Sequence, residues 1–125
     1  MSKIRIWGRE FDLDPIYDCY PGETVLPEQL NAAEAFFREG ERILDEALPR
    51  VKDYCLARNG REIGEEAIGN IFRYVMPTSV FVKRTGPETR LVALLCEYRF
   101  DPEHGLAVVF RDNRFTEIGP QDIIL

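Results

Sequence analysis

The sequence predicts an α+β fold: an antiparallel β-meander with an N-terminal β-hairpin, and two or three helices packed on one face. Three observations lead to this fold class. Residues 79–118 hold four short segments with strand-like apolar patterns, which are joined by tight turns. The first 20 residues carry a similar pattern. Between these parts, residues 26–75 have apolar side chains at helical spacing.

The first two predicted strands form the hairpin. Ile4 and Ile6 alternate with other residues, and a glycine turn follows them. In the returning strand two apolar residues alternate with three acids, so the acids share the outward face. These acids, here called the acidic row, are Glu10, Asp12 and Asp14. Pro15 lacks a backbone donor and therefore marks an edge strand, a bulge or the end of the strand, and 16–20 continues the extended pattern.

The helical pattern runs from about residue 26 to 58, and Asn59-Gly60 predicts a C-terminal stop. A straight helix of about 32 residues would measure ~48 Å, whereas a domain of this size is only ~36 Å across. We therefore expect a kink near Pro49 or, as a second alternative, a break at Gly40. A shorter helical pattern follows over 62–75 and ends at Pro77.

The segment 91–100 is predicted to be the central strand, because both of its faces are apolar over its first half. The turn Asp101-Pro102-Glu103-His104-Gly105 follows it. Its aspartate, proline and glycine suit the turn positions, and we expect a left-handed backbone at Gly105. Asp112-Asn113 predicts a second, two-residue turn, because both residue types tolerate positive φ.

Length and composition are those of a single globular domain over residues 1–125, with 45% hydrophobic and 30% charged residues. No apolar run approaches the roughly 20 residues that a membrane span needs, and no signal peptide is evident. We therefore expect a cytoplasmic protein. The chain has 3 cysteines, which show neither a disulfide framework nor a zinc spacing, so we expect buried, reduced thiols: Cys19, Cys55 and Cys96.

The net charge of −6 is unevenly distributed along the chain. Residues 10–46 contain 11 acids and 2 bases, which gives this part a net charge of −9. An acidic domain repels nucleic acids and anionic membranes, so we expect neither as a partner. We expect a protein partner, and the acidic charge favours a basic one. The sequence leaves the oligomeric state open.

One stretch offers side chains for chemistry. Asp101, Glu103 and His104 could bind a metal if a second segment, such as Asp112 or Asp122, converged on them. The simpler interpretation is that Asp101 caps the turn, Glu103 is solvated and His104 hydrogen-bonds locally. The sequence contains no nucleophile motif and no phosphate-binding glycine loop. It therefore predicts no catalytic residue and no cofactor.

Several stretches together resemble a known family. They are Cys96-Glu97-x-x-Phe100-Asp101-x-Glu103-His104-Gly105-Leu106-x-Val108-x-Phe110, Glu117-Ile118-Gly119-x-Gln121-Asp122-Ile123, Asp18-Cys19-Tyr20-x-Gly22-Glu23 and Thr24-x-x-x-x-Gln29. The family comprises small bacterial domains of unknown function, similar to immunity proteins of polymorphic toxin systems. Phe100 stands where the family's hairpin usually has tryptophan. The resemblance implies a cytoplasmic α+β protein with no established catalytic residues.

Two functional hypotheses follow from these observations. The first is a non-enzymatic protein-binding domain, of the immunity type, that neutralises a basic toxin and docks it through Glu10, Asp12 and Asp14. The alternative is a metal-assisted hydrolase that uses the Asp101, Glu103 and His104 turn. They differ in where the partner or substrate would bind.

Overall fold

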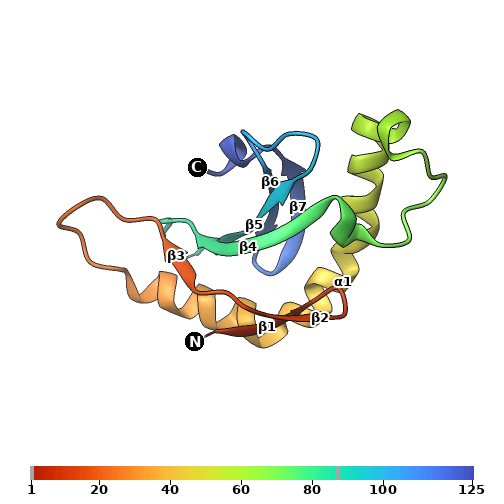
Figure 1. The fold of residues 1–125 in the computed structure, drawn as a ribbon. Coiled ribbons are helices and arrows are strands. Elements are labelled where there is room, and N and C mark those ends of the chain that lie inside the picture. Colours follow the sequence, from red (N-terminus) through yellow and green to blue (C-terminus); the bar gives the residue numbers. More distant parts are fainter. Residues whose placement is uncertain (1, 87) are drawn as a thin grey trace.

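The computed structural model describes residues 2–86 and 88–125 (Figure 1). It confirms the α+β class. The helices among these residues are α1 (Pro27–Ile63) and the 3-10 helices η1 (Ile71–Arg73) and η2 (Gln121–Ile123). The strands are β1 (Lys3–Ile6), β2 (Arg9–Asp12), β3 (Pro15–Tyr17), β4 (Val75–Val82), β5 (Leu91–Tyr98), β6 (Leu106–Arg111) and β7 (Arg114–Gly119).

Five of the strands form one sheet, in the order β3-β4-β5-β6-β7. The last four form an antiparallel meander, and β5 lies at the centre of the five-stranded sheet, as the sequence predicts. Strand β3 joins at the edge, parallel to β4, with Pro15 opposite Val80 and Tyr17 opposite Val82. The sequence predicts extended structure near β3 but not this parallel pairing, because a local pattern does not identify a distant partner.

The N-terminal hairpin is also confirmed. Strands β1 and β2 pair antiparallel around a turn in which Trp7 and Gly8 both have positive φ, 51° and 86°. The hairpin packs on α1 at Gly40. A Cβ atom at Gly40 would lie 2.5 Å from Cδ1 of Ile4, so the glycine allows β1 to approach the helix closely. Gly40 therefore has a packing role.

The prediction of two or three α-helices is wrong, because the single helix α1 spans residues 27–63. Its backbone stays helical through Gly40 and Pro49, and within α1 only Asn59 leaves helical angles, with φ −134° and ψ 28°. The predicted break at Gly40 is therefore absent. Figure 1 shows that α1 changes direction along its course, around the place where its label stands. Gly64, with φ 69°, ends the helix.

The second predicted helix, over 62–75, is replaced by an irregular segment, by η1 and by the start of β4. Ile68, Ile71 and Val75 are buried, so their spacing reflects contact with the core rather than a helical period. Pro77 does not end a helix. It lies inside β4, where the register shifts between Pro77 and Ser79, and such a bulge accommodates a residue that has no N–H group.

The two faces of the sheet are covered differently. Side chains of α1, such as Phe36 and Leu44, pack against the face that includes Val82 and Phe110. The other face carries a smaller cluster over which the C-terminal tail places Ile124. The members of this second cluster are Phe81, Ala93, Leu95, Ala107, Val109 and Ile124.

Two of the three cysteines are buried, as predicted. Burial raises the pKa of Cys55 to about 11 and also raises the pKa of Cys96. Cys19 is only partly buried, so the expectation is wrong for that residue. In the part of the chain that the structure describes, α1 and the shorter helices are too polar or too short to cross a bilayer.

Candidate functional site

The turn after β5 is held together by Asp101. Its Oδ1 atom accepts hydrogen bonds from the backbone N–H of His104 at 3.2 Å and from the His104 ring Nδ1 at 3.0 Å. Its carbonyl oxygen accepts from the N–H of Gly105 at 2.9 Å, and Gly105 has the predicted left-handed backbone, with φ 61°. Asp101 therefore caps the turn.

The same contact shifts the protonation of both side chains. The hydrogen bond from His104 lowers the pKa of Asp101, and the bond to Asp101 and its negative charge raise the pKa of His104. Both carboxylate oxygens of Asp101 face the ring, at 3.0 and 3.2 Å. Over residues 2–86 and 88–125, three or more histidine, cysteine, aspartate or glutamate side chains do not gather anywhere as a metal site. Asp101, Glu103 and His104 therefore lack a converging second segment there.

The turn is also fastened to the C-terminal tail. The backbone N–H of Gln121 donates to the carbonyl oxygen of His104 at 3.0 Å, and its side-chain Nε2 donates to the carbonyl oxygen of Cys96 at 3.1 Å. A Cβ atom at Gly105 would lie 2.7 Å from both that carbonyl oxygen and Nε2. The hairpin stretch and the C-terminal stretch of the resemblance therefore meet here in a structural contact.

The acidic row is exposed, as predicted, but bases stand beside it. Lys3 lies opposite Asp12 on the neighbouring strand, and its Nζ is 3.6 Å from Oε1 of Glu10. Oδ1 of Asp12 accepts from the backbone N–H of Ser2 at 2.9 Å. Lys3 therefore offsets part of the negative charge of the row, which weakens its attraction to a partner.

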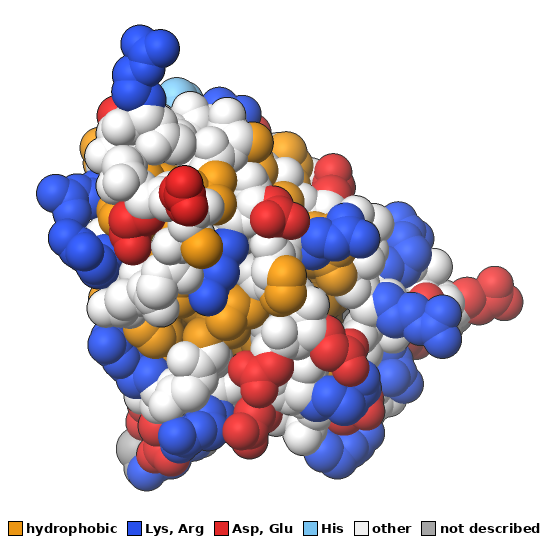
Figure 2. Space-filling model, turned by 90° about the vertical axis from the view of Figure 1, so that its right-hand side faces the viewer, with side chains coloured by type: hydrophobic (Ala, Val, Ile, Leu, Met, Phe, Trp, Pro, Cys, Tyr) orange, Lys and Arg blue, Asp and Glu red, His pale blue; other side chains and the backbone are white. Residues whose placement is uncertain are grey.

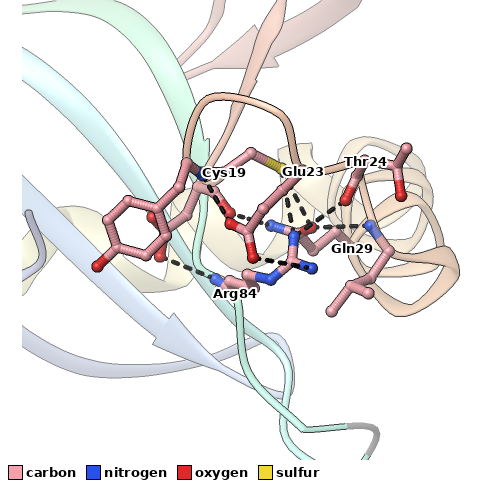
Figure 3. A network of polar contacts seen from close by, with 8 residues as sticks. Cys19, Glu23, Thr24, Gln29 and Arg84 are labelled. Atoms are coloured by element: carbon pink, nitrogen blue, oxygen red, sulfur yellow. Dashed lines mark hydrogen bonds and ion pairs between the residues drawn. The ribbon is translucent and has the colours of Figure 1, made fainter.

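A polar network holds the loop between β3 and α1 (Figure 3). Arg84 Nη1 donates to the carbonyl oxygen of Thr24 at 3.0 Å and lies 3.4 Å from Sγ of Cys19, while Nη2 lies 3.6 Å from Oε2 of Glu23. Gln29 is buried. Its Oε1 accepts from the N–H of Leu26 at 2.9 Å, which caps the start of α1. These polar groups are committed to positioning the loop.

A groove elsewhere on α1 combines exposed carboxylates with apolar side chains. It lies between the helix around Pro49 and residues 66–68, and its volume is about 430 Å³. We call it the acid groove, and its lining residues are Asp45, Leu48, Pro49, Lys52, Asp53, Leu56, Glu66, Ala67 and Ile68. Figure 2 shows this side of the molecule, where hydrophobic side chains gather among acidic and basic ones.

The three carboxylates of the acid groove, on Asp45, Asp53 and Glu66, are exposed and make no ion pair with another residue of 2–86 or 88–125. Lys52 is the single base in the lining. The sequence places Asp45 on the outer side of the helix, but it gives no signal that Glu66 lies across from it. That proximity depends on how the segment after Gly64 returns along α1.

Comparisons with known proteins define the family and give no activity. No curated protein and no solved structure matches the chain. The family DUF6985, described as a domain of unknown function, matches residues 1–125. The predicted membership of a family of unknown function is thereby confirmed, and the chain belongs to DUF6985.

Proposed function

We propose that this chain is a non-enzymatic protein-binding domain whose acid groove docks a basic segment of a partner protein. The observation that carries the proposal is the groove itself. Apolar side chains of Leu48, Leu56 and Ile68 line it, and unpaired carboxylates stand around them. A partner segment with an apolar side chain between lysines or arginines would match both features.

Long-range charge supports the same partner. Asp45 belongs to the part of the chain, residues 10–46, that has a net charge of −9. A field of one sign accelerates the encounter with a partner of opposite sign, and the acceleration decreases as salt screens the charges. In this proposal the acidic row contributes to steering, whereas the acid groove forms the contact.

Within this proposal, a basic toxin is the partner that the resemblance to immunity proteins favours. Such a protein would cover the toxin stoichiometrically and would not modify it. Co-expression with basic toxins encoded beside the gene tests this finer statement. We expect the wild type to restore growth. Variants in which the carboxylates of the acid groove are neutralised should fail to restore it.

A metal-assisted hydrolase at the Asp101, Glu103 and His104 turn has less support. Both carboxylate oxygens of Asp101 face the ring of His104, and the backbone of His104 is bound to Gln121. These contacts favour a structural role for the turn.

The docking proposal is tested with peptides selected from a random library on the wild-type protein. We expect the selected peptides to contain lysine or arginine beside apolar residues. The triple change Asp45→Asn, Asp53→Asn and Glu66→Gln should weaken their binding by about tenfold, since an exposed ion pair contributes roughly 0.2–1 kcal/mol. Chemical shift changes should lie on both walls of the acid groove.

The matched control is the triple change Glu10→Gln, Asp12→Asn and Asp14→Asn, which alters the net charge equally. It should reduce only the association rate at low salt, where the Debye length is ~30 Å at 0.01 M, and not at 0.15 M, where it is ~8 Å. Equal losses of affinity from the two triple changes would contradict a specific role for the groove. Selected peptides without basic residues would do so as well.

A further inference from the structure

A second cleft lies where β4 begins and β5 ends, and no function discussed so far uses it. Its volume is about 370 Å³, within the range of small-molecule sites. We call it the arginine cleft, and its lining residues are Phe72, Arg73, Tyr74, Met76, Glu97, Tyr98, Arg99 and Pro102. Apolar and aromatic side chains therefore form much of its wall, with two guanidinium groups beside them.

The aromatic part of the arginine cleft is fixed by ring contacts. Tyr74 stacks on Phe100, with ring centroids 5.7 Å apart, and Tyr98 meets the same ring edge-on, also at 5.7 Å. Phe72 packs against Trp7 of the hairpin turn at 5.9 Å. A ligand would thus meet a surface that is already ordered, which lowers the entropic cost of binding.

The two arginines are held near each other by the backbone. The N–H of Arg99 donates to the carbonyl oxygen of Tyr74 at 2.8 Å, and Arg73 is the residue before Tyr74. The hydrogen bond to Glu65 raises the pKa of Tyr74, and the positive charges of Arg73 and Arg99 both oppose that rise. Both arginines therefore lie beside Tyr74.

Neither guanidinium has a carboxylate within ion-pair distance among the residues that the structure describes. A third cation is close, because Cζ of Arg9 lies 4.1 Å from the ring centroid of Phe72. Two carboxylates oppose them: Glu97 lines the cleft, and Glu65 accepts from the hydroxyl of Tyr74. The local balance is positive in a protein whose net charge is −6.

We infer that the arginine cleft binds a small organic anion, with a carboxylate or phosphate group attached to a flat apolar body. Guanidinium groups bind planar oxyanions through paired, charge-assisted hydrogen bonds, and Arg73 and Arg99 are free to make them. The body of the ligand would lie against Phe72 and Met76, which are partly exposed. The acid groove is not involved, so this site would function with or without a protein partner.

The test uses four probes with the full chain: benzoate, phenyl phosphate, inorganic phosphate and the neutral analogue benzamide. Binding is followed by chemical shift changes in NMR spectra. We expect benzoate or phenyl phosphate to shift the resonances of Phe72, Tyr74 and Arg99, and benzamide to leave them in place. The comparison of benzoate with phenyl phosphate identifies the preferred anionic group, and inorganic phosphate shows whether the apolar body is needed.

Two exposed-residue variants, Arg73→Gln and Arg99→Gln, should each weaken binding by at least about tenfold. The matched control is Arg114→Gln, on the strand at the far edge of the sheet, which removes the same charge. Unchanged thermal unfolding of each variant establishes that the fold is retained. Absence of binding by every anion would overturn the inference. Equal losses in Arg114→Gln, or equal binding of benzamide, would overturn it too.

Discussion

The acid groove lies on a helix, whereas the arginine cleft lies at the ends of two hydrogen-bonded strands. One wall of the groove is α1 beside Pro49, and the other is the irregular stretch 66–68. In the cleft, β4 and β5 hold their side chains in a fixed register, with Val75 opposite Tyr98. The segment between α1 and β4 contributes to both sites: Glu66 lines the acid groove, and Arg73 lines the arginine cleft.

The difference in construction explains why we assign different ligands. An irregular wall can adjust to a protein segment, and loops are the parts of a fold that move most easily. In the arginine cleft, Arg73 ends η1 and Arg99 follows β5, and the hydrogen bond from Arg99 to Tyr74 fixes the two backbone positions, which suits recognition of a small planar anion. Opposite charge at the two sites also reduces competition for one ligand.

Replacing Tyr98 should have the largest effect, because this side chain joins the arginine cleft to α1, the helix that forms one wall of the acid groove. Its ring is buried in the wall of the arginine cleft, and its hydroxyl donates to Oδ1 of Asn59, the non-helical residue of α1, at 2.6 Å. Tyr98→Ala should lower the free energy of unfolding by about 3–5 kcal/mol and abolish anion binding. Tyr98→Phe, which keeps the ring, should lower it by about 1–2 kcal/mol.

Urea unfolding measures both changes. If Tyr98→Phe lowered the free energy of unfolding as much as Tyr98→Ala, the hydrogen bond to α1 would stabilise the arginine cleft more than packing of the ring does. In that case the two regions would not be independent.

Gly105→Ala should have the next largest effect, and should act on the side of the arginine cleft only. Alanine at φ 61° is strained by about 1–2 kcal/mol, and its Cβ atom would also meet the carbonyl oxygen of Cys96. Gly64→Ala is the matched control, because Gly64 has φ 69° and open space around it. Gly64→Ala should therefore destabilise the protein less. Equal losses in chemical denaturation would show that the close contact with Cys96 and Gln121 is unimportant.

Tyr74→Phe should have a smaller effect that depends on pH. The hydrogen bond from Tyr74 lowers the pKa of Glu65 below its ordinary value of 4.5. A carboxylate with a lowered pKa in the folded state stabilises the protein above 4.5, and this contribution is lost as the pH falls through the lowered value. Thermal unfolding of wild type and variant should therefore differ at neutral pH and converge in acid. A difference that persists in strong acid would contradict this origin.

His104→Ala should have the smallest effect, since His104 is exposed. The raised pKa of His104 means that its contact with Asp101 stabilises the protein below the ordinary value of 6.5. The contribution is lost as the pH rises through the raised value. Stability should thus differ from wild type in weak acid and agree in alkali, with Glu103→Gln as a neutral control. Two results together would instead support a metal site. His104→Ala would destabilise the protein as much as Gly105→Ala does, and added zinc would stabilise the wild type alone.

Features with local causes could be predicted from the sequence. The positive φ angles of Gly105, Asp112 and Asn113 follow from residue type, and all three are observed. The central position of β5 follows from its two apolar faces. The exposure of the acidic row follows from alternation along β2. Each of these depends on residues a few positions apart.

Features with distant causes could not be predicted. The pairing of β3 with β4 depends on contacts between segments that are far apart in the chain, and no local pattern identifies parallel partners. The apolar spacing in 62–75 equally suits a helix or an irregular segment pressed against the core. For the same reason, Glu66 could not be assigned to the acid groove, nor Arg73 and Arg99 to one cleft.

The parallel edge strand imposes an order on folding. Asp18 and Arg84, whose hydrogen bond closes the end of β3, are 66 positions apart, so this contact closes a long loop and forms slowly. The hairpin β1–β2, the helix and the meander can form from nearer neighbours. Before β3 pairs with β4, the outer edge of β4 has unpaired backbone N–H and C=O groups. Another partly folded chain could add a strand at this edge. The slow pairing of β3 therefore leaves a period in folding when the edge of β4 is open to aggregation.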